Sequence, residues 1–294
     1  KPGNGGGWSH GTHVAGLLNS STDNNLGISS VAFNSNVMSV KVSRESQQGQ
    51  IFITEGYLGI LYAAQAGHGA GSFAIINNSW GGIGYNAYEQ DVINVCHNQY
   101  KAIVLAAAGN GDGGELYGTH YPSSYDNVIS VTALGSSDNW NHWANYHETV
   151  DISAPGENIR STVINNYSTW SGTSMATPIV ASCVGLLQAF RPEWTSEQLG
   201  TMIIETANPV IYSINSETYL EGTLGSGRVD VLQAIITELY PKLELMGYDL
   251  EIINNNDGTI SPGDELHLFL VIYNEDGWGN ANNISVNMYS MSNN

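Results

Sequence analysis

The chain of 294 residues contains 27 Asp and Glu residues but only 8 Lys and Arg residues, which gives a formal net charge of −19 at pH 7. Because such a charge repels phosphate groups, we expect no nucleic acid partner and no binding to anionic membranes. The longest apolar run, Ala102–Ala108, is much shorter than the roughly 18 residues of a membrane helix, so we expect no membrane span. Cys96 and Cys183 lie in apolar segments, which favours two buried free thiols over a disulfide.

The first predicted element in chain order is a helix that follows His10. His10 opens the segment HGTHVAG, whose small and apolar residues continue through Leu18. A histidine in this position can act as a general base. His10 and His13 could instead form a metal pair, but the known zinc motif needs a spacing of four residues with a glutamate between them. The spacing here is three and the glutamate is missing, so we favour the base.

Apolar runs then alternate with longer helix-like stretches. The expected strands are Val37–Val42, Ala74–Ile76, Ile103–Ala108 and Val128–Val131, and the expected crossover helices are Gly59–Ala66 and Glu89–Gln99. This alternation predicts an α/β fold whose parallel sheet is covered by helices on both faces, with reactive loops at the carboxyl ends of the strands.

Asn110 stands at such a strand end. It follows the apolar run Ile103–Ala108 and Gly109, so its side-chain amide is expected at the mouth of the sheet, where it can donate a hydrogen bond to an oxyanion. The glycines around it also resemble a nucleotide-binding loop. No Lys-Ser or Lys-Thr pair follows, so we reject that interpretation.

Ser174 lies in the segment GTSMATP, directly before a predicted helix over Pro178–Phe190. Gly172 allows the backbone to turn and another molecule to approach, and the helix N-terminus provides a positive field for the serine hydroxyl. Ser174 could therefore act as a nucleophile. The commoner role of a serine beside a helix is that of an N-cap, so the segment by itself leaves both roles open. A further helix is predicted over Ser196–Glu205.

The order of these three motifs resembles that of the subtilisin-like serine proteases, in which His, oxyanion Asn and nucleophilic Ser follow one another in the same way. Further likeness extends from about the first residue to about Leu239 and is carried by the segments Ile76–Gly82, Tyr121–Pro122, Ser153–Gly156 and Gly225–Asp230. The segment Ser153–Gly156 resembles a loop that precedes the serine in this family. The bond between Tyr121 and Pro122 matches one that is cis in relatives.

The resemblance implies a three-layer subtilisin-like fold in which Ser174 is the nucleophile, His10 the general base and Asn110 the oxyanion donor. It also implies that an extended substrate pairs with the backbone of a substrate strand and enters a small apolar pocket, which we expect to favour large apolar or aromatic side chains. The implied substrate-binding residues are Ser79, Trp80, Gly81, Ala107, Ala108, Gly109, Gly172 and Thr173. For Trp80, burial in the core is the alternative role.

One residue of the family pattern is absent. Subtilisin-like proteases place a triad aspartate upstream of the histidine, before Ser-Gly or Thr-Gly, and none of the aspartates in this sequence has that context. We therefore expect the aspartate upstream of residue 1, and little or no activity for this stretch alone. The N-terminal segment Lys1–Gly7 has neither the basic start nor the apolar run of a signal peptide and reads as a loop.

Towards its C-terminus the sequence changes to strand-like segments. Leu266–Tyr273 and Ile284–Tyr289 are predicted strands on either side of the turn-rich segment Asn274–Asn280. A β-sandwich takes about 100 residues, roughly twice what remains after Pro241. We therefore predict a peptidase domain over residues 1–240 and the beginning of a β-sandwich-like accessory domain over residues 241–294.

The predicted function is that of a secreted or extracellular serine endopeptidase, a monomer that acts on proteins or peptides without a catalytic cofactor or metal. Asp23–Gly27 falls where many relatives carry a calcium loop, but its ligand spacing does not support a structural calcium site. Asn254–Gly258 is interpreted as a turn rather than a calcium loop. The alternative functions are an inactive binding scaffold with the same fold, or an adhesion module centred on the C-terminal strands.

Overall fold

The computed structural model describes residues 9–43, 53–111, 116–253, 259, 265–282 and 284–286. The chain forms two compact units, Lys1–Thr237 and Glu238–Asn294. The predicted loops Lys1–Gly7 and Asn254–Gly258 lie outside the described residues.

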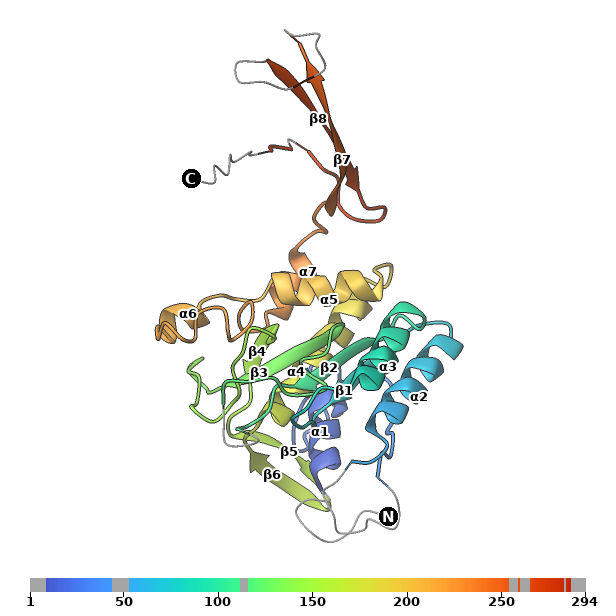
Figure 1. The fold of residues 1–294 in the computed structure, drawn as a ribbon. Helices are drawn as coiled ribbons and strands as arrows, with labels where there is room; N and C mark the ends of the chain where they lie inside the picture. The colour runs from blue at the N-terminus through green and yellow to red at the C-terminus, as the bar shows by residue number, and fades with distance from the viewer. Residues whose placement is uncertain are drawn as a thin grey trace. The chain divides into compact units, whose positions relative to one another are not determined.

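A four-stranded parallel sheet forms the centre of the first unit (Figure 1). Its strands are β1 (Ile75–Asn78), β2 (Ile103–Ala107), β3 (Val128–Leu134) and β4 (Ile152–Pro155), and they lie side by side in this order. Every residue of β2 and β3 is buried, which explains why both strands are nearly continuous apolar runs in the sequence. The parallel sheet predicted from the alternation of elements is confirmed.

Helices supply the other layers. α2 (Gly56–Gly69) and α3 (Ala87–Asn98) pack together against one face, where Ile60 and Ile93 join Ile76 and Val104 in one buried cluster. α4 (Thr173–Phe190) contacts all four strands, and α1 (His10–Asn19) packs beside it. The remaining helices are α5 (Ser196–Glu205), α6 (Ile211–Ile214) and α7 (Val231–Ile236). The three-layer fold is confirmed.

α4 begins at Thr173, five residues before the predicted start at Pro178. Proline has no N–H, so it cannot donate to the carbonyl four residues earlier, which belongs to Ser174. The hydroxyl of Ser79 donates to that carbonyl instead, over 2.8 Å. The helix therefore continues through Pro178, and Ser174 lies inside its first turn.

α4 is also the one helix in the described part of the chain whose length and composition suit a membrane crossing. Its sequence contains no long uninterrupted apolar run, because Ser and Thr residues interrupt it. Most of its residues are buried inside the protein, among the four strands and α1, as expected for the central helix of a folded domain.

Two local predictions differ from the structure, and one element had no prediction. Val37–Val42 is not a strand, because no neighbouring strand in the described residues provides backbone hydrogen bonds along it. The backbone N–H groups of Thr54 and Glu55 donate to the Val42 carbonyl at its end. The segment Ser153–Gly156, expected to be a loop, lies largely in β4. A hairpin of β5 (Ile159–Val163) and β6 (Asn166–Trp170) was not predicted at all.

The second unit contains an antiparallel pair, β7 (Leu243–Ile252) and β8 (Leu266–Asn274), with an irregularity near Leu245. β8 confirms the strand predicted at Leu266–Tyr273. Residues 284–286 of the other predicted strand have no regular structure, and its last three residues lie outside the described part. In the first unit, Cys96 and Cys183 are buried and free, as expected.

Candidate active site

The three predicted catalytic residues and the predicted substrate-binding residue Ser79 come from four different elements that end or begin near one another. Ser79 follows β1, Asn110 follows β2, Ser174 is the second residue of α4, and His10 is the first residue of α1. Because parallel strands present their carboxyl ends at one edge of a sheet, residues distant in the sequence meet there. The hydrogen bonds of Ser174 and Asn110 show this convergence directly.

Ser174 and Ser79 hold each other through two hydrogen bonds. The Ser174 hydroxyl donates to the Ser79 carbonyl over 3.1 Å, and the Ser79 hydroxyl donates to the Ser174 carbonyl over 2.8 Å. The side chain of Asn77 donates to the Ser79 hydroxyl. These bonds fix the start of α4 on the end of β1. Within the described residues, no hydrogen bond joins the Ser174 hydroxyl to His10.

Asn110 is oriented by its neighbour Thr173. The Asn110 side-chain oxygen accepts from the Thr173 backbone N–H over 2.9 Å and from its hydroxyl over 3.1 Å. The Thr173 hydroxyl also accepts from the Gly109 N–H. The amide nitrogen of Asn110 and the backbone N–H of Ser174 donate to no group in the described part of the chain. Two donors are therefore available beside the Ser174 hydroxyl.

His10 lies at the start of α1, and the same helix places Val14 and Leu17 against Met175 of α4. The ring of His10 is nearly parallel to that of Trp170, with 6.4 Å between centroids. Burial, and secondly the charge of His13, lower the pKa of His10 from its usual value near 6.5, so the ring is held in the neutral form that a general base requires.

His13 has a structural role. It is fully buried, its ring stacks on Trp170 at 4.4 Å between centroids, and its Nε2 lies 3.2 Å from the Ser168 carbonyl. Trp170 is therefore a site residue that sequence reasoning missed, although it stands only four positions before Ser174. Among the described residues no group of three His, Cys, Asp or Glu side chains could hold a metal ion.

The segment after β1, Ser79–Gly81, passes the start of α4 without belonging to a strand. Gly82 exchanges two backbone hydrogen bonds of 2.8 Å with Tyr121, whereas the backbone groups of Trp80 and Gly81 pair with no backbone group in the described residues. The Trp80 ring is partly buried and meets Tyr57 edge to face, so this residue also contributes to the core. The bond between Tyr121 and Pro122 is cis, as expected.

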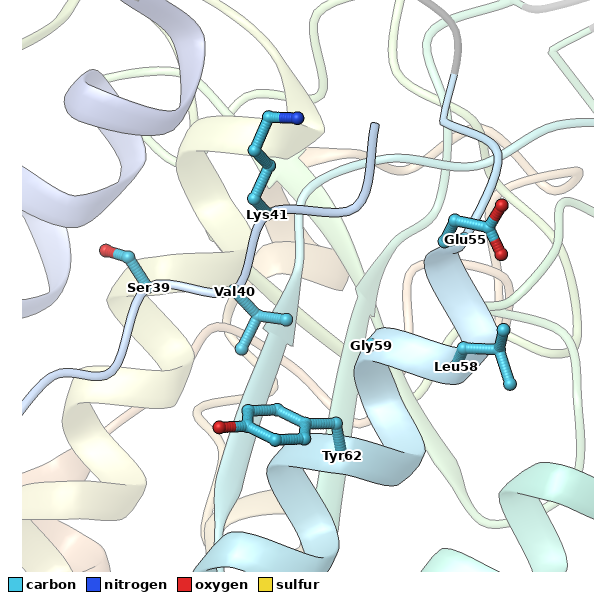
Figure 2. A pocket seen from close by; sticks show the side chains of 7 residues that line it. All are labelled: Ser39, Val40, Lys41, Glu55, Leu58, Gly59 and Tyr62. Atoms are coloured by element: carbon cyan, nitrogen blue, oxygen red, sulfur yellow. The ribbon is translucent and has the colours of Figure 1, made fainter. Parts of the chain in front are cut away.

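A pocket of about 360 Å³ lies elsewhere on this unit, between residues 39–41 and the start of α2. Figure 2 shows Lys41 and Glu55 on opposite sides of it, with Tyr62 along its wall. It shares no residue with the cluster around Ser174. The chemistry of the site therefore lies in the strand ends and helix starts, not in this pocket.

Comparisons with known proteins agree with this geometry. The family model described as "Subtilase family" matches residues 3–233. Thermitase of Thermoactinomyces vulgaris is 37% identical over 187 residues, which are 63% of this chain and 62% of thermitase. A cell wall-associated protease of Bacillus subtilis (strain 168) is 36% identical over 205 residues, 69% of this chain but 22% of that protein.

A solved structure of a protease from Pseudoalteromonas arctica superposes with a TM-score of 0.64 and 26% identity, covering 78% of this chain and 70% of that one. The chain thus spans less than two thirds of the length of both curated relatives. The ordered motifs, the parallel sheet and the matched range together identify the chain as a member of the subtilase family.

Proposed function

We propose that the protein is a serine endopeptidase whose nucleophile is Ser174. The observation that carries this proposal is the orientation of Asn110. Because Thr173 occupies its side-chain oxygen, the amide nitrogen remains as a donor, next to the N–H of Ser174 in the first turn of α4. Two fixed N–H donors beside a serine hydroxyl are the requirement for stabilising the oxyanion of an acyl-transfer reaction.

The proposed reaction has two halves. The Ser174 oxygen attacks the carbonyl carbon of a peptide bond while His10 takes the hydroxyl proton, and the negative oxygen that forms is bound by Asn110 and the Ser174 N–H. His10 then gives the proton to the leaving amine, and the C–N bond breaks. His10 then takes a proton from water, and the water oxygen attacks the acyl-enzyme. The ester bond to the Ser174 oxygen breaks, which releases the acid product, and His10 gives the proton back to Ser174. An aspartate that orients His10 is proposed upstream of residue 1.

Substrate is proposed to bind as an extended strand along Ser79, Trp80 and Gly81. The backbone groups of Trp80 and Gly81 pair with no backbone group in the described residues, which supports this, since an added strand would satisfy those polar groups. Ala107–Gly109 would form the other wall of the side-chain pocket, and Gly172 and Thr173 would contact the substrate at the start of α4. We assign this activity to residues 1–240 and an accessory β domain to residues 241–294.

Labelling with a fluorophosphonate tests this function directly. In the full-length protein we expect one adduct, located on Ser174 by mass spectrometry, because only an activated serine reacts with the phosphorus centre at an appreciable rate. Ser174→Ala is expected to remain unlabelled. Absence of an adduct in the folded wild-type protein would favour the inactive scaffold or the adhesion module.

The role of Asn110 is tested by Asn110→Asp, which retains the oxygen that Thr173 binds but removes the amide donors. We expect kcat for peptide hydrolysis to fall about 10² to 10³-fold, the established size for the corresponding asparagine of subtilisin, with a small change in KM. Asn127→Asp, at an exposed turn, is the matched control and should retain full activity. Equal kcat for wild type and Asn110→Asp would remove Asn110 from the mechanism.

We further propose that the protein acts outside the cell as a monomer, on protein or peptide substrates, and without a catalytic cofactor or metal. The acidic composition supports solubility of a monomer. The cell wall-associated protease among its relatives supports an extracellular location.

A further inference from the structure

The hairpin of β5 and β6 touches the helix of the proposed base and leads directly to the proposed nucleophile. β5 contacts α1, the helix that begins with His10, and β6 ends at Trp170, four residues before Ser174. Between them, the Gly172 N–H donates to the Gly156 carbonyl over 2.8 Å, which fixes the segment that enters α4. One short hairpin therefore connects the two groups that exchange a proton in the proposed reaction.

Two hydroxyl groups hold this hairpin on α1. The Ser161 hydroxyl donates to the His13 carbonyl over 2.6 Å, and the Thr162 hydroxyl donates to the Thr12 carbonyl over 2.9 Å. Both carbonyls belong to the first turn of α1. A Cβ added to Gly16 would lie 2.4 Å from each hydroxyl oxygen, so the absence of a side chain there allows both bonds. The position of the first turn is thus set by β5.

Trp170 adds a ring contact from β6. Its indole stacks on the ring of His13, with 4.4 Å between centroids and 8° between planes. His13 is fully buried, and its Nε2 lies 3.2 Å from the Ser168 carbonyl of the same strand, so the stacked pair has little freedom. The indole is also nearly parallel to the ring of His10, at 6.4 Å and 14°, within the range of interacting aromatic rings.

This indole restricts the ring of His10. A histidine side chain has several staggered rotamers, and a general base needs the one that brings a ring nitrogen within hydrogen-bond reach of the Ser174 hydroxyl. A ring that is already held near that orientation loses less entropy when the proton moves. The indole also keeps water from one side of the ring, and so contributes to the burial that lowers the pKa of His10.

Few titratable groups surround His10 in the described part of the chain. α4 and β5 pack against α1, and their ionisable side chains are Cys183, whose pKa is raised to about 12 by burial, and Arg160, whose guanidinium lies over the Tyr167 ring. The one charge that lowers the pKa of His10 is that of His13, and its effect is smaller than that of burial. Covering of the ring is therefore the main influence on its protonation.

We propose that Trp170 is a positioning residue, whose indole holds the His10 imidazole in the orientation that takes the proton of Ser174. The hairpin of β5 and β6 keeps the indole and α1 in fixed relation. This inference rests on the proposed peptidase function and goes beyond it, because it adds a residue that acts through His10 and exchanges no proton itself.

The first test measures two rates in the full-length protein. One is kcat for a peptide p-nitroanilide, and the other is the rate of reaction with diisopropyl fluorophosphate, a small reagent that has no peptide residues to bind. In Trp170→Ala we expect both rates to fall about 10- to 100-fold, the size that a misplaced catalytic group produces, with little change in KM. Trp170→Phe retains a ring that can stack and should restore most of both rates.

The second test is the pH dependence of kcat/KM. In Trp170→Ala the midpoint of the acid limb should move to higher pH, because opening His10 to water raises its pKa towards the usual value of 6.5. Trp170→Phe should keep the wild-type midpoint. Trp194→Ala is the matched control, since it removes a buried indole at the opposite end of α4 from Ser174. It should lower the melting temperature and leave kcat and the midpoint unchanged.

A raised KM in Trp170→Ala, with wild-type kcat, phosphorylation rate and pH midpoint, would show that Trp170 only contacts substrate and would overturn the inference. Trp170→Leu, which keeps apolar bulk without a flat ring, guards against a folding defect in Trp170→Ala. Its rates should lie below those of Trp170→Phe, and equal rates in these two variants would also overturn the inference. Failure of the wild-type protein to hydrolyse the peptide and to react with the fluorophosphate would instead overturn the proposed function.

Discussion

Ser174→Ala is expected to lower kcat for peptide hydrolysis by the full-length protein about 10⁶-fold, the established size for loss of the nucleophile in a subtilisin. The physical reason is that no acyl-enzyme can form without the Ser174 oxygen, so that only oxyanion stabilisation and substrate positioning remain. The measurement is the rate of hydrolysis of a peptide p-nitroanilide, with wild-type protein assayed under the same conditions.

The structure allows this loss to be separated from unfolding. Ser174 is half-buried and, among the described residues, its hydroxyl donates one hydrogen bond, to the Ser79 carbonyl, so its removal should cost only about 1 kcal/mol of stability. Thermal unfolding followed by circular dichroism should therefore be nearly unchanged. Ser171→Ala, three residues earlier and exposed, is the control that should retain activity. Activity of Ser174→Ala close to that of wild type would refute the proposed mechanism.

His10→Ala is expected to cause a loss of similar size, because an un-ionised serine is a weak nucleophile without a base to take its proton. His13 offers a sharp comparison three residues away. Since His13 is fully buried and stacked on Trp170, its replacement by alanine should lower the melting temperature. His10 is only half-buried, so His10→Ala should remain folded and lose activity.

The two variants thus distinguish a base from a packing residue by two measurements, kcat/KM and the melting temperature. The assignment would be reversed if His13→Ala were folded but inactive while His10→Ala hydrolysed peptides normally. Retention of activity in both variants would show that neither histidine acts as the base.

Much of the fold followed from local patterns in the sequence. The buried runs of β2 and β3 and the length of α3 are visible there, because parallel strands buried on both faces leave nearly continuous apolar segments. The hairpin of β5 and β6 escaped detection. Its strands are short and polar, Asn165 adopts the positive φ that the turn requires, and the Ser161 hydroxyl donates to the His13 carbonyl, a long-range contact with no local signal.

Val37–Val42, in contrast, was predicted to be a strand and is not one. Its alternating apolar residues have strong strand propensity, but a strand exists only when a neighbour supplies hydrogen-bond partners, and the described residues supply none. The start of α4 likewise depended on a contact from elsewhere, since the Ser79 hydroxyl binds the carbonyl that Pro178 leaves without a donor.

By itself, the sequence determined the α/β class and singled out His10, Asn110 and Ser174 as residues suited to acyl-transfer chemistry. Residue types and the order of motifs along the chain can be read without knowing which residues meet in space. Only the tertiary structure decided that Thr173 binds the Asn110 side-chain oxygen and that Trp170 flanks both histidines. These facts depend on which side chains meet across the ends of separate strands. Packing sets those distances, and no spacing along the chain encodes them.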